Sequence, residues 1–299
     1  MSKDPAPAIY GLIGYPVRHS LSAAMHNAAF QSLGINAEYR LFEISPAALN
    51  AFLRGDLEVS DIEGRSVRSG DIAGFNVTIP HKVPMLVEAK TTQLDLLTLL
   101  CGAVNTVKRE GERLLYHNTD CIGFITSLQR DLKFNTAGKT TVVIGCGGAG
   151  RAVIAGLAQK GMGVKKIYIF DLNPQVAEAT LRHFSKFEDL GCSPELILAQ
   201  ELPRKIQEAD LLVNASPVGM KEGDDPAVEK EWLHPRLSVY DVVYNRTTEL
   251  LRESRSLGIP SCGGLGMLLY QGVHAFEIWF GDQKAPVEVM HQALLGSPQ

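Results

Sequence analysis

The sequence has few cysteines, no paired cysteine motif and no long apolar run, and each absence excludes a class of protein. Its five cysteines are scattered over 299 residues without a C-x-x-C pair, which argues against a disulfide framework and against a zinc site. No signal-peptide segment opens the chain, and no run reaches the roughly 18 apolar residues that a membrane-spanning helix needs. We therefore expect a cytoplasmic protein with reduced thiols, no metal and no membrane partner.

The sequence also lacks an excess of charge of either sign. Its formal net charge is −4, which argues against a nucleic-acid partner because proteins that bind nucleic acid carry clustered basic residues. Apolar residues make up 45% and charged residues 21% of the chain, the usual composition of a globular protein. A chain of 299 residues can bury a substantial core and suits two domains better than one.

Residues 140–157 carry the motif around which the chain is organised. A β-branched run, Thr140–Ile144, precedes a G-x-G-x-x-G motif at Gly145, Gly147 and Gly150, and apolar residues at helical spacing follow. Strand, glycine turn and helix in this order predict a dinucleotide-binding site. The first glycine allows the sharp turn, the second leaves room for a pyrophosphate, and the third lets the helix pack against the strand. The helix N-terminus offers its N–H groups to the phosphates.

A second predicted strand, Lys166–Phe170, ends at Asp171, about 20 residues beyond the glycines, where a ribose-binding acid belongs. A carboxylate there accepts hydrogen bonds from the ribose of NAD and repels the 2′-phosphate of NADP. No Arg or Lys follows before Arg182, so the sequence predicts that NAD is preferred and that NADP is possible, with Arg151 as a guanidinium that can reach the adenosine side. The alternative is that Asp171 merely caps the helix expected from Pro174.

Strands and helices alternate along the chain, which predicts an α/β protein of two domains. From Thr140 to Cys262 the alternation is typical of a doubly wound parallel sheet, the Rossmann nucleotide-binding fold. The first 118 residues alternate in the same way without a phosphate loop, so we expect a separate α/β domain there. Within it, Ser22 is expected to cap a helix, residues 54–70 to form an exposed loop, and Asn118–Asp120 to cap the next helix.

Polar residues gather where the predicted strands end, which is where open α/β folds bind ligands. Taken singly, each has a structural explanation: serines and Asp120 cap helices, Asn-Thr pairs form turns, and a lone lysine or glutamine is usually solvated. Their coincidence favours a binding site, and its candidate members are Ser20, Ser22, Asn76-x-Thr78-x-Pro80-x-Lys82, Asn105-Thr106, Asn118-x-Asp120 and Gln271.

The order of these motifs resembles that of the shikimate dehydrogenase family, including the quinate/shikimate dehydrogenases, over nearly the whole chain. The motifs that carry the resemblance are Gly14-x-Pro16-x-x-His19-Ser20-x-Ser22, Asn76-Val77-Thr78-Ile79-Pro80-x-Lys82, Gly102-Ala103-Val104-Asn105-Thr106, Asn118-Thr119-Asp120-x-x-Gly123, Gly145-x-Gly147-Gly148-Ala149, Asn214-x-Ser216-Pro217-x-Gly219-Met220, Asp241-Val242-Val243-Tyr244-Asn245 and Gly264-x-Gly266-Met267-Leu268-x-x-Gln271.

The resemblance implies a substrate-binding domain of residues 1–119 and 265–299 and a Rossmann domain of residues 120–264. It implies that Lys82 and Asp120 are the catalytic pair. The residues that it places on the substrate are Ser20, Ser22, Thr78, Asn105, Tyr244 and Gln271. The glycine motif, the position of Asp171 and the resemblance together assign to the cofactor Gly145, Gly147, Gly148, Ala149, Gly150, Asp171, Ser216, Met220, Gly264 and Met267.

The sequence departs from the family pattern at several positions. Ala23 and Arg246 stand where the family usually has proline, and the segment 54–70 is longer than is typical. Asp171 replaces the asparagine–arginine pair that usually follows the second strand in members that use NADP. The first two departures bear on substrate preference, and the last on the cofactor.

The resemblance implies a shikimate dehydrogenase, which interconverts 3-dehydroshikimate and shikimate with NAD or NADP in aromatic amino-acid (chorismate) biosynthesis. Carbonyl reduction needs a hydride donor and a proton donor, and we assign the proton transfer to Lys82 and Asp120 as a pair. Two alternatives stay open: a quinate/shikimate dehydrogenase of broad specificity that uses NAD, and a non-catalytic protein that binds the metabolite to regulate a partner. A monomer and a homodimer are both compatible with the sequence.

Overall fold

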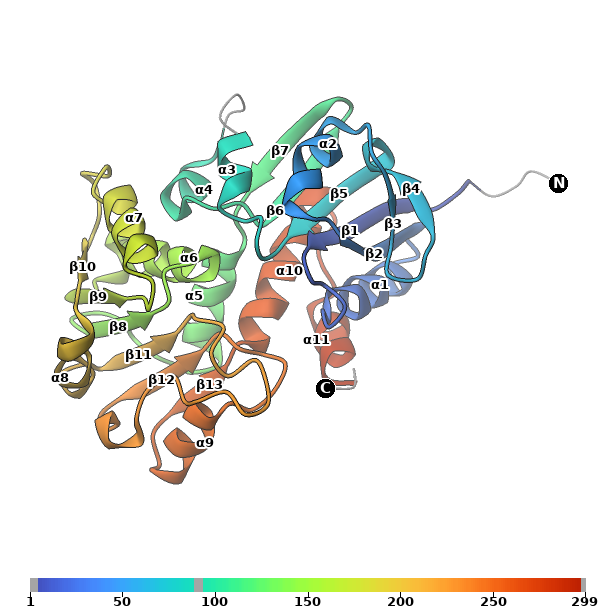
Figure 1. Cartoon of the computed structure of the whole chain (residues 1–299). Helices are drawn as coiled ribbons and strands as arrows, with labels where there is room; N and C mark the ends of the chain where they lie inside the picture. The colour runs from blue at the N-terminus through green and yellow to red at the C-terminus, as the bar shows by residue number, and fades with distance from the viewer. Residues whose placement is uncertain (1–4, 89–93, 297–299) are drawn as a thin grey trace. The chain divides into compact units, whose positions relative to one another are not determined.

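The chain folds into two compact α/β units (Figure 1). The computed structural model describes residues 5–88 and 94–296. Among these, residues 5–88, 94–99, 103–119 and 271–296 form the first unit, and residues 100–102 and 120–270 form the second. The chain returns to the first unit between Tyr270 and Gln271, inside a helix, whereas the expected boundary lies at residues 264 and 265. Residues 1–4, 89–93 and 297–299 of the expected substrate domain lie outside the described residues.

The first unit is built on a five-stranded mixed sheet in the order β2-β1-β5-β6-β7. β1 pairs in parallel with β2 and β5, and the β6–β7 hairpin adds two antiparallel strands at one edge. Because β1 and β5 are parallel neighbours, their carboxyl ends and the loops that follow lie at the same edge of the sheet. The strands are β1 (Ala8–Gly14), β2 (Ala37–Glu43), β5 (Ile72–Val77), β6 (Thr106–Glu110) and β7 (Arg113–His117).

Apolar residues cover both faces of this sheet. The strands are therefore buried on two sides, with a part of the core on each side. On one face Phe42, Phe75 and Val107 pack with Phe52 of α2. On the other face Tyr10 contacts the aromatic rings of α1 and of the last part of α10, within about 6 Å between ring centroids. The helices are α1 (Ser22–Ser32), α2 (Leu49–Arg54), α3 (Pro84–Glu88), α4 (Leu96–Cys101), α10 (Leu265–Phe280) and α11 (Val287–Gly296).

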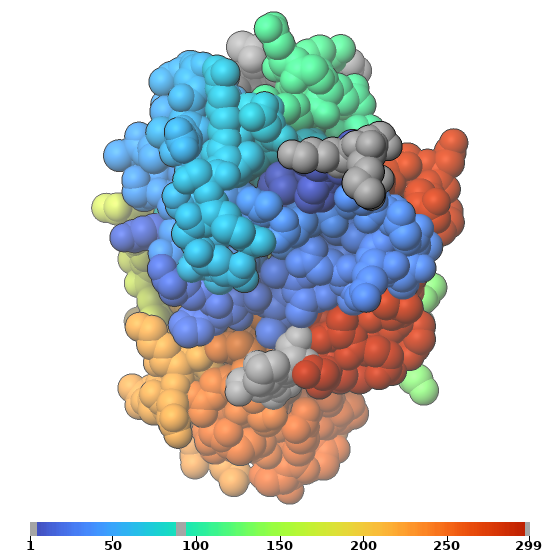
Figure 2. All heavy atoms as spheres, turned by 90° about the vertical axis from the view of Figure 1, so that its right-hand side faces the viewer, coloured from blue at the N-terminus to red at the C-terminus, as the bar shows by residue number. Residues whose placement is uncertain are grey.

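The expected exposed loop at residues 54–70 is wrong, because this segment forms a second small sheet. Strands β3 (Glu58–Ser60) and β4 (Ser66–Arg68) pair antiparallel, and Val59 is buried. Figure 2 shows this hairpin, in light blue to cyan, on the outer surface of the first unit. The turn of the hairpin also pairs with the edge strand β2, where the Ile62 N–H donates to the Leu41 carbonyl over 3.0 Å.

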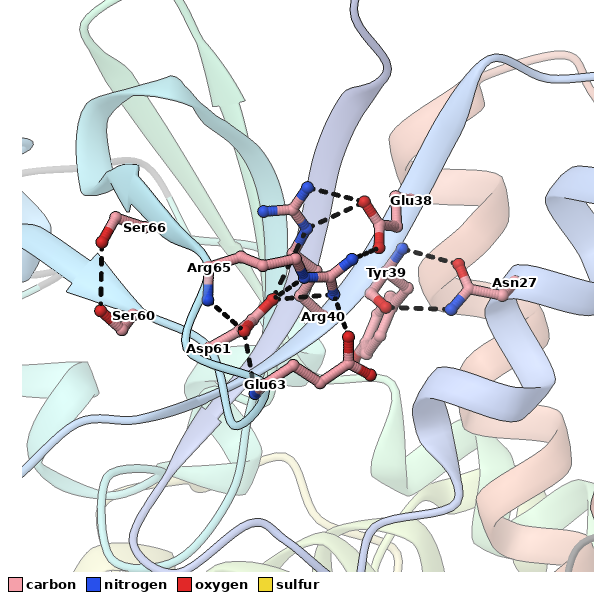
Figure 3. A network of polar contacts seen from close by, with 9 residues as sticks. All are labelled: Asn27, Glu38, Tyr39, Arg40, Ser60, Asp61, Glu63, Arg65 and Ser66. Carbon is pink, nitrogen blue, oxygen red and sulfur yellow. Dashed lines mark hydrogen bonds and ion pairs between the residues drawn. The ribbon is translucent and has the colours of Figure 1, made fainter.

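An ion network holds the hairpin on β2 (Figure 3). Asp61 accepts hydrogen bonds from the Arg65 backbone and side chain, at 3.0 and 2.8 Å, and Arg65 also reaches Glu38 of β2 at 2.5 Å. Although burial opposes ionisation, the hydrogen bonds from Arg65 keep the pKa of Asp61 below its ordinary value. The charges that make this segment look like a solvated loop are therefore paired with one another, and they cover a sheet edge that would otherwise expose backbone groups.

The second unit contains a six-stranded parallel sheet in the order β10-β9-β8-β11-β12-β13. This is the strand order of the doubly wound dinucleotide-binding fold, so the predicted α/β class with a Rossmann domain is confirmed. The order reverses between β8 and β11, which is where such sheets bind ligands. The strands are β8 (Thr140–Ile144), β9 (Lys166–Phe170), β10 (Pro194–Leu196), β11 (Leu211–Asn214), β12 (Ser238–Asp241) and β13 (Ser261–Gly263).

Helices cover both faces of the second sheet (Figure 1). Leu202 and Leu250, from α8 and α9, pack with Val142, Leu212 and Val239 on one face. On the other face lie α5 and α6. The helices are α5 (Asp120–Arg130), α6 (Gly148–Leu157), α7 (Pro174–Phe184), α8 (Leu202–Gln207) and α9 (Glu249–Ser256), followed by the first part of α10. No sequence pattern predicts β10, α8 or α11. In the described part of the chain, no helix combines the length and apolarity needed to cross a membrane.

Candidate functional site

Loops at the carboxyl ends of β1 and β5 bring several of the predicted site residues together in the first unit. The Thr78 N–H donates to the Ile13 carbonyl over 2.9 Å, and the Tyr15 N–H donates to the Ile79 carbonyl over 2.9 Å, so the two loops are joined. In the loop after β1, the Ser20 hydroxyl donates to the Ser22 hydroxyl over 3.1 Å.

Ser22 is the first residue of α1 and does not cap it. The predicted cap is therefore wrong, since the capping position belongs to Leu21, which makes no side-chain cap hydrogen bond. The Ser22 N–H instead donates to the Ser20 hydroxyl over 3.2 Å. This turn places two hydroxyl groups side by side at the start of the helix.

Lys82 lies in the loop after β5, where its side chain is half-buried. Its carbonyl accepts a hydrogen bond from the Val104 N–H over 2.8 Å. Val104 directly precedes Asn105, so the backbone links the predicted catalytic lysine to the segment that carries a predicted substrate-binding residue.

Asn105 is the centre of a buried polar network in the first unit. Its Nδ2 donates to Gln271 Oε1 over 3.4 Å, although 166 positions separate the two residues in the sequence. Its Oδ1 accepts from the Thr119 N–H over 2.7 Å and from the Thr106 hydroxyl over 3.1 Å. Gln271 is only 7% exposed, which excludes the alternative that it is a surface residue. The network presents amide and hydroxyl groups of the kind that bind a polyhydroxylated carboxylate.

Asn76 extends this network toward β2. Its Nδ2 donates to Thr106 Oγ1 over 3.0 Å, and its Oδ1 accepts from the Tyr39 hydroxyl over 2.8 Å. Because every buried polar group that is left without a partner costs stability, these contacts fix the rotamers of the whole network.

Asp120 begins the long segment 120–270 of the second unit and is the first residue of α5, where it is only 4% exposed. It therefore belongs to the helix and is not the residue that caps it. It directly follows Thr119, whose N–H is held by Asn105. Tyr244, the predicted substrate-binding residue of the second unit, follows β12 and is half-buried.

The glycine loop, residues 145–150, has the geometry that its sequence predicts. Gly145 has a φ of +94°, and a Cβ there would meet the Ser216 nitrogen at 2.6 Å. Gly147 is the N-cap of α6 and faces open space, so the backbone is bare at this point. A Cβ at Gly150 would collide with the Gly145 carbonyl. The loop therefore leaves room for an anion at the start of α6, where helix amides attract one.

Asp171 is held beside the glycine loop by two backbone donors. Its Oδ2 accepts from the Cys146 N–H over 2.7 Å, and its Oδ1 accepts from the Asn173 N–H over 2.8 Å. The alternative that Asp171 caps α7 is wrong, because the N-cap is Asn173, whose side chain accepts from the Gln175 N–H. Arg151 is buried, and its Nη1 lies 3.5 Å from the Gly102 carbonyl.

The remaining predicted cofactor residues lie in two loops of the second unit. Ser216 and Met220 follow β11, and the Met220 side chain is 42% exposed. Gly264 precedes α10, where a Cβ would collide with the Val242 carbonyl, and Met267 lies buried in the first turn. The close approach at Gly264 explains why this position needs a glycine. Gly148 and Ala149 are the first residues of α6.

Two polar residues at the ends of the central strands, Asn214 and Asp241, have no role assigned to them from the sequence. Asn214 and Asp241 are fully buried and hydrogen-bonded to each other over 3.0 Å. A polar residue at the last position of an apolar strand is the signal that could have identified them.

Burial raises the pKa of the Cys146 thiol to about 12, so this thiol stays protonated and is not a nucleophile. Within residues 5–88 and 94–296, no three His, Cys, Asp or Glu side chains lie where they could hold a metal.

Comparison with known families identifies both ends of the chain. Residues 12–107 match the shikimate dehydrogenase substrate binding domain, and residues 264–295 match the shikimate 5′-dehydrogenase C-terminal domain. The chain is 39% identical over 298 residues to the shikimate dehydrogenase (NADP(+)) of Methanopyrus kandleri, covering 99% of this chain and 97% of that relative.

Two solved structures resemble the whole chain. The crystal structure of shikimate 5-dehydrogenase from Listeria monocytogenes, in complex with shikimate and NAD, has a TM-score of 0.80 at 33% identity and covers 98% of both chains. Quinate dehydrogenase from Corynebacterium glutamicum, in complex with NAD, has a TM-score of 0.82 at 29% identity and covers 97% of this chain and 99% of that one.

Proposed function

We propose, from the premise that the chain belongs to the shikimate dehydrogenase family, that it interconverts 3-dehydroshikimate and shikimate with a nicotinamide cofactor. The observation that carries this proposal is the similarity to shikimate dehydrogenases over 99% of the chain. The reaction belongs to aromatic amino-acid (chorismate) biosynthesis. Residues 1–119 and 265–299 would form its substrate-binding domain, and residues 120–264 its nucleotide-binding domain.

The residues of the second unit fit a dinucleotide. Bare backbone at Gly147 and the N-terminus of α6 suit the pyrophosphate, and the Asp171 carboxylate suits a ribose diol. We assign the nicotinamide end of the site to Ser216, Met220, Gly264 and Met267. When bound, the nicotinamide supplies or accepts the hydride.

Lys82 and Asp120 carry the proton transfer in this proposal. During reduction the Lys82 ammonium donates a proton to the carbonyl oxygen and stabilises the negative charge that develops on it. The Asp120 carboxylate orients the ammonium. An ammonium and a carboxylate that act on one proton titrate as a coupled pair, so we assign the proton transfer to the pair and not to either residue.

The substrate carboxylate and hydroxyl groups would bind to Ser20, Ser22, Thr78, Asn105, Tyr244 and Gln271. The support comes from the Asn105–Gln271 contact and from the paired hydroxyls of Ser20 and Ser22. A site that hydrogen-bonds hydroxyl groups rejects analogues that lack them, because its own buried groups are then left without partners.

For the cofactor, we propose that the protein uses NAD in preference to NADP. The Asp171 carboxylate, fixed by two backbone donors, repels a 2′-phosphate, and the next side chain is Leu172, which is 81% exposed and uncharged. Arg151 is buried against Gly102, which leaves it badly placed to compensate. The names of the curated relatives favour NADP(+), and the solved relatives include complexes with NADP as well as with NAD, so this preference rests on Asp171 alone.

A second candidate function is a quinate/shikimate dehydrogenase of broad specificity, because the fold matches a quinate dehydrogenase as closely as a shikimate dehydrogenase, with TM-scores of 0.82 and 0.80. A steady-state assay that crosses shikimate and quinate with NAD and NADP decides between the two. We expect kcat/KM to be highest for shikimate with NAD. A quinate value comparable to that of shikimate would replace the biosynthetic assignment by the second candidate. Clear shikimate binding without any turnover would favour a regulatory, non-catalytic protein.

A further inference from the structure

The carboxyl ends of β11 and β12 carry a buried pair of an acid and an amide. Asn214 and Asp241, the last residues of these strands, are register partners, and both are 0% exposed. The Asn214 Nδ2 donates to Asp241 Oδ1 over 3.0 Å. A carboxylate withdrawn from water in this way needs donors around it, so its partners show which segments it connects.

Asp241 accepts three hydrogen bonds from three different segments. Besides Asn214, the Val243 N–H donates to Oδ1 over 3.1 Å, and the Thr248 hydroxyl donates to Oδ2 over 2.6 Å. Burial raises the pKa of Asp241 to about 6, while the three donors oppose that shift. Through these hydrogen bonds the acid joins the end of β11, the turn after β12 and Thr248, the N-cap of α9.

Asn214 passes this connection on to the loop of residues 215–220. Its Oδ1 accepts from the N–H and the hydroxyl of Ser216, over 3.2 and 2.6 Å, and its Nδ2 also donates to the Val218 carbonyl over 3.1 Å. Since its Nδ2 must face the Asp241 carboxylate, its Oδ1 is turned toward Ser216. If the amide were reversed, its oxygen would face the Asp241 carboxylate and its NH2 group would face the Ser216 N–H, and neither contact could be a hydrogen bond.

The same loop packs against the glycine loop. The Ala215 N–H donates to the Ile144 carbonyl over 2.7 Å. A Cβ on Gly145 would lie only 2.6 Å from the Ser216 nitrogen, so the two loops are in close contact. At the far end of the loop, Gly219 has a φ of +95° and lies against the Thr248 side chain. Asp241 therefore secures both ends of the loop, one through Asn214 and the other through Thr248.

We propose that Asp241 is a positioning residue for the nicotinamide dinucleotide, holding the 215–220 loop against the glycine loop through Asn214. The identity of the ligand rests on the proposed function. Because Asp241 lies beneath the loop and acts through it, its removal affects NAD and NADP alike, which separates its role from that of Asp171.

Direct binding of NADH and NADPH to the full-length protein, followed by cofactor fluorescence, tests the proposal. Asp241→Ala removes the acceptor of three hydrogen bonds, so we expect the Kd of both cofactors to rise about tenfold or more. Asp241→Asn keeps an acceptor toward Asn214 and Val243 and a donor toward Thr248, so its Kd should stay within about threefold of wild type. The KM for shikimate at saturating cofactor should change less than the cofactor Kd in both variants, because all the proposed substrate-binding residues except Tyr244 lie in the first unit.

Asp210→Ala is the matched control. Asp210 precedes β11 at the opposite edge of the same sheet, where it accepts from Lys139 Nζ over 3.0 Å and from the Thr140 N–H over 2.9 Å. Its removal weakens the sheet without touching the loop, so the cofactor Kd should stay within about twofold of wild type. An equal loss of affinity in Asp210→Ala and Asp241→Ala would show a general destabilisation and would overturn the proposal.

Asn214→Ala provides the second measurement and decides the matter if Asp241→Ala does not fold. We expect Asn214→Ala to lose as much cofactor affinity as Asp241→Ala. The cofactor Kd of the double variant should be no higher than that of the single variant that binds more weakly, because both residues act through one loop. Unchanged affinity in either single variant, or additive losses, would contradict the proposal. Wild-type protein that binds NADH but does not oxidise shikimate would refute the proposed function and leave this test intact.

Discussion

Asp171 and Cys146 are joined by a hydrogen bond between the end of β9 and the glycine loop, with the Cys146 N–H donating to Asp171 Oδ2 over 2.7 Å. The second carboxylate oxygen is held by the Asn173 N–H over 2.8 Å. A negative charge is thereby fixed at the place where the adenosine ribose of a dinucleotide is read in this fold. In our proposal the choice of cofactor depends on this charge, which can accept hydrogen bonds from the ribose diol of NAD and repels the 2′-phosphate of NADP, and on the uncharged neighbour Leu172.

We expect Asp171→Asn to narrow the preference for NAD over NADP, because it removes the repulsion of the 2′-phosphate. Leu172→Arg should move the preference toward NADP, since a guanidinium binds phosphate with two hydrogen bonds. The measurement is kcat/KM for both cofactors at saturating shikimate. Leu257→Arg, which adds the same charge at another exposed leucine of the second unit, serves as the control and should leave the ratio unchanged. A wild-type preference for NADP would refute the proposed role of Asp171.

Lys82→Ala should lower kcat by roughly 10²–10⁴-fold, the usual contribution of a positioned acid–base group, with a smaller change in KM. Asp120→Asn should lower kcat in the same way. Since the two residues act as a unit, the double variant should be little worse than the poorer single variant. Lys108→Ala, which removes a lysine from β6 of the first unit, is the control and should keep its turnover. Turnover at the wild-type rate in Lys82→Ala would remove this lysine from the mechanism.

Gln271→Ala should raise the KM for shikimate about tenfold or more, because Asn105 and the bound substrate each lose a partner in a buried network. The Kd of the reduced cofactor should stay within about twofold of wild type. Gln292→Ala removes a glutamine from the exposed surface of α11 and is the matched control. Weaker cofactor binding with an unchanged shikimate KM would show that Gln271 does not contact the substrate.

His26 makes the first unit sensitive to acid. Its ring stacks on Tyr39 at 4.6 Å between centroids, and among the described residues neither ring nitrogen has a hydrogen-bond partner. Burial lowers the pKa of His26 from 6.5 to about 3. Between these pH values the unfolded chain binds a proton that the folded chain does not, so the free energy of unfolding decreases as the pH falls.

His26→Phe should remove this contribution. Urea unfolding at pH 7 and pH 5 measures it, and we expect the wild type to lose about 2 kcal/mol more than the variant over this range. Equal losses in both proteins would mean that His26 takes up a proton in the folded state.

Lys133 is the one described residue other than glycine with a positive φ, +54°, in the turn after α5. A side chain in this conformation costs roughly 1–2 kcal/mol, whereas glycine adopts it freely but loses more entropy on folding. Lys133→Gly should therefore raise the free energy of unfolding by about 0.5–1 kcal/mol, as measured by urea denaturation. Lys133→Ala keeps the Cβ and should be nearly neutral, and a gain equal to that of glycine would contradict the explanation.

Local chemistry made the second unit readable from the sequence. The glycine loop is predicted from three glycines within six residues, and the strands are predicted from short apolar runs. The proposed role of Asp171 on a ribose follows from its distance to the glycine loop. Each of these signals involves near neighbours in the chain, and the structure places β8, β9 and α6 accordingly. Candidate site residues in the loops after β1 and β5 are likewise predictable, because parallel strands gather ligand groups at their carboxyl ends.

Tertiary contacts decided what the sequence could not. Residues 58–68 form a hairpin because Arg65 reaches Glu38 of β2, 27 positions away, and Asp61 pairs with Phe42 of the same edge strand. Gln271 is buried beside Asn105, to which it is hydrogen-bonded although 166 positions separate the two residues. The role proposed for Asp241 depends on its hydrogen bond with Asn214, its neighbour in the sheet. A turn or a helix cap needs only its neighbours, whereas the partner of a buried charge or amide is set by which strands and helices the folded chain brings together.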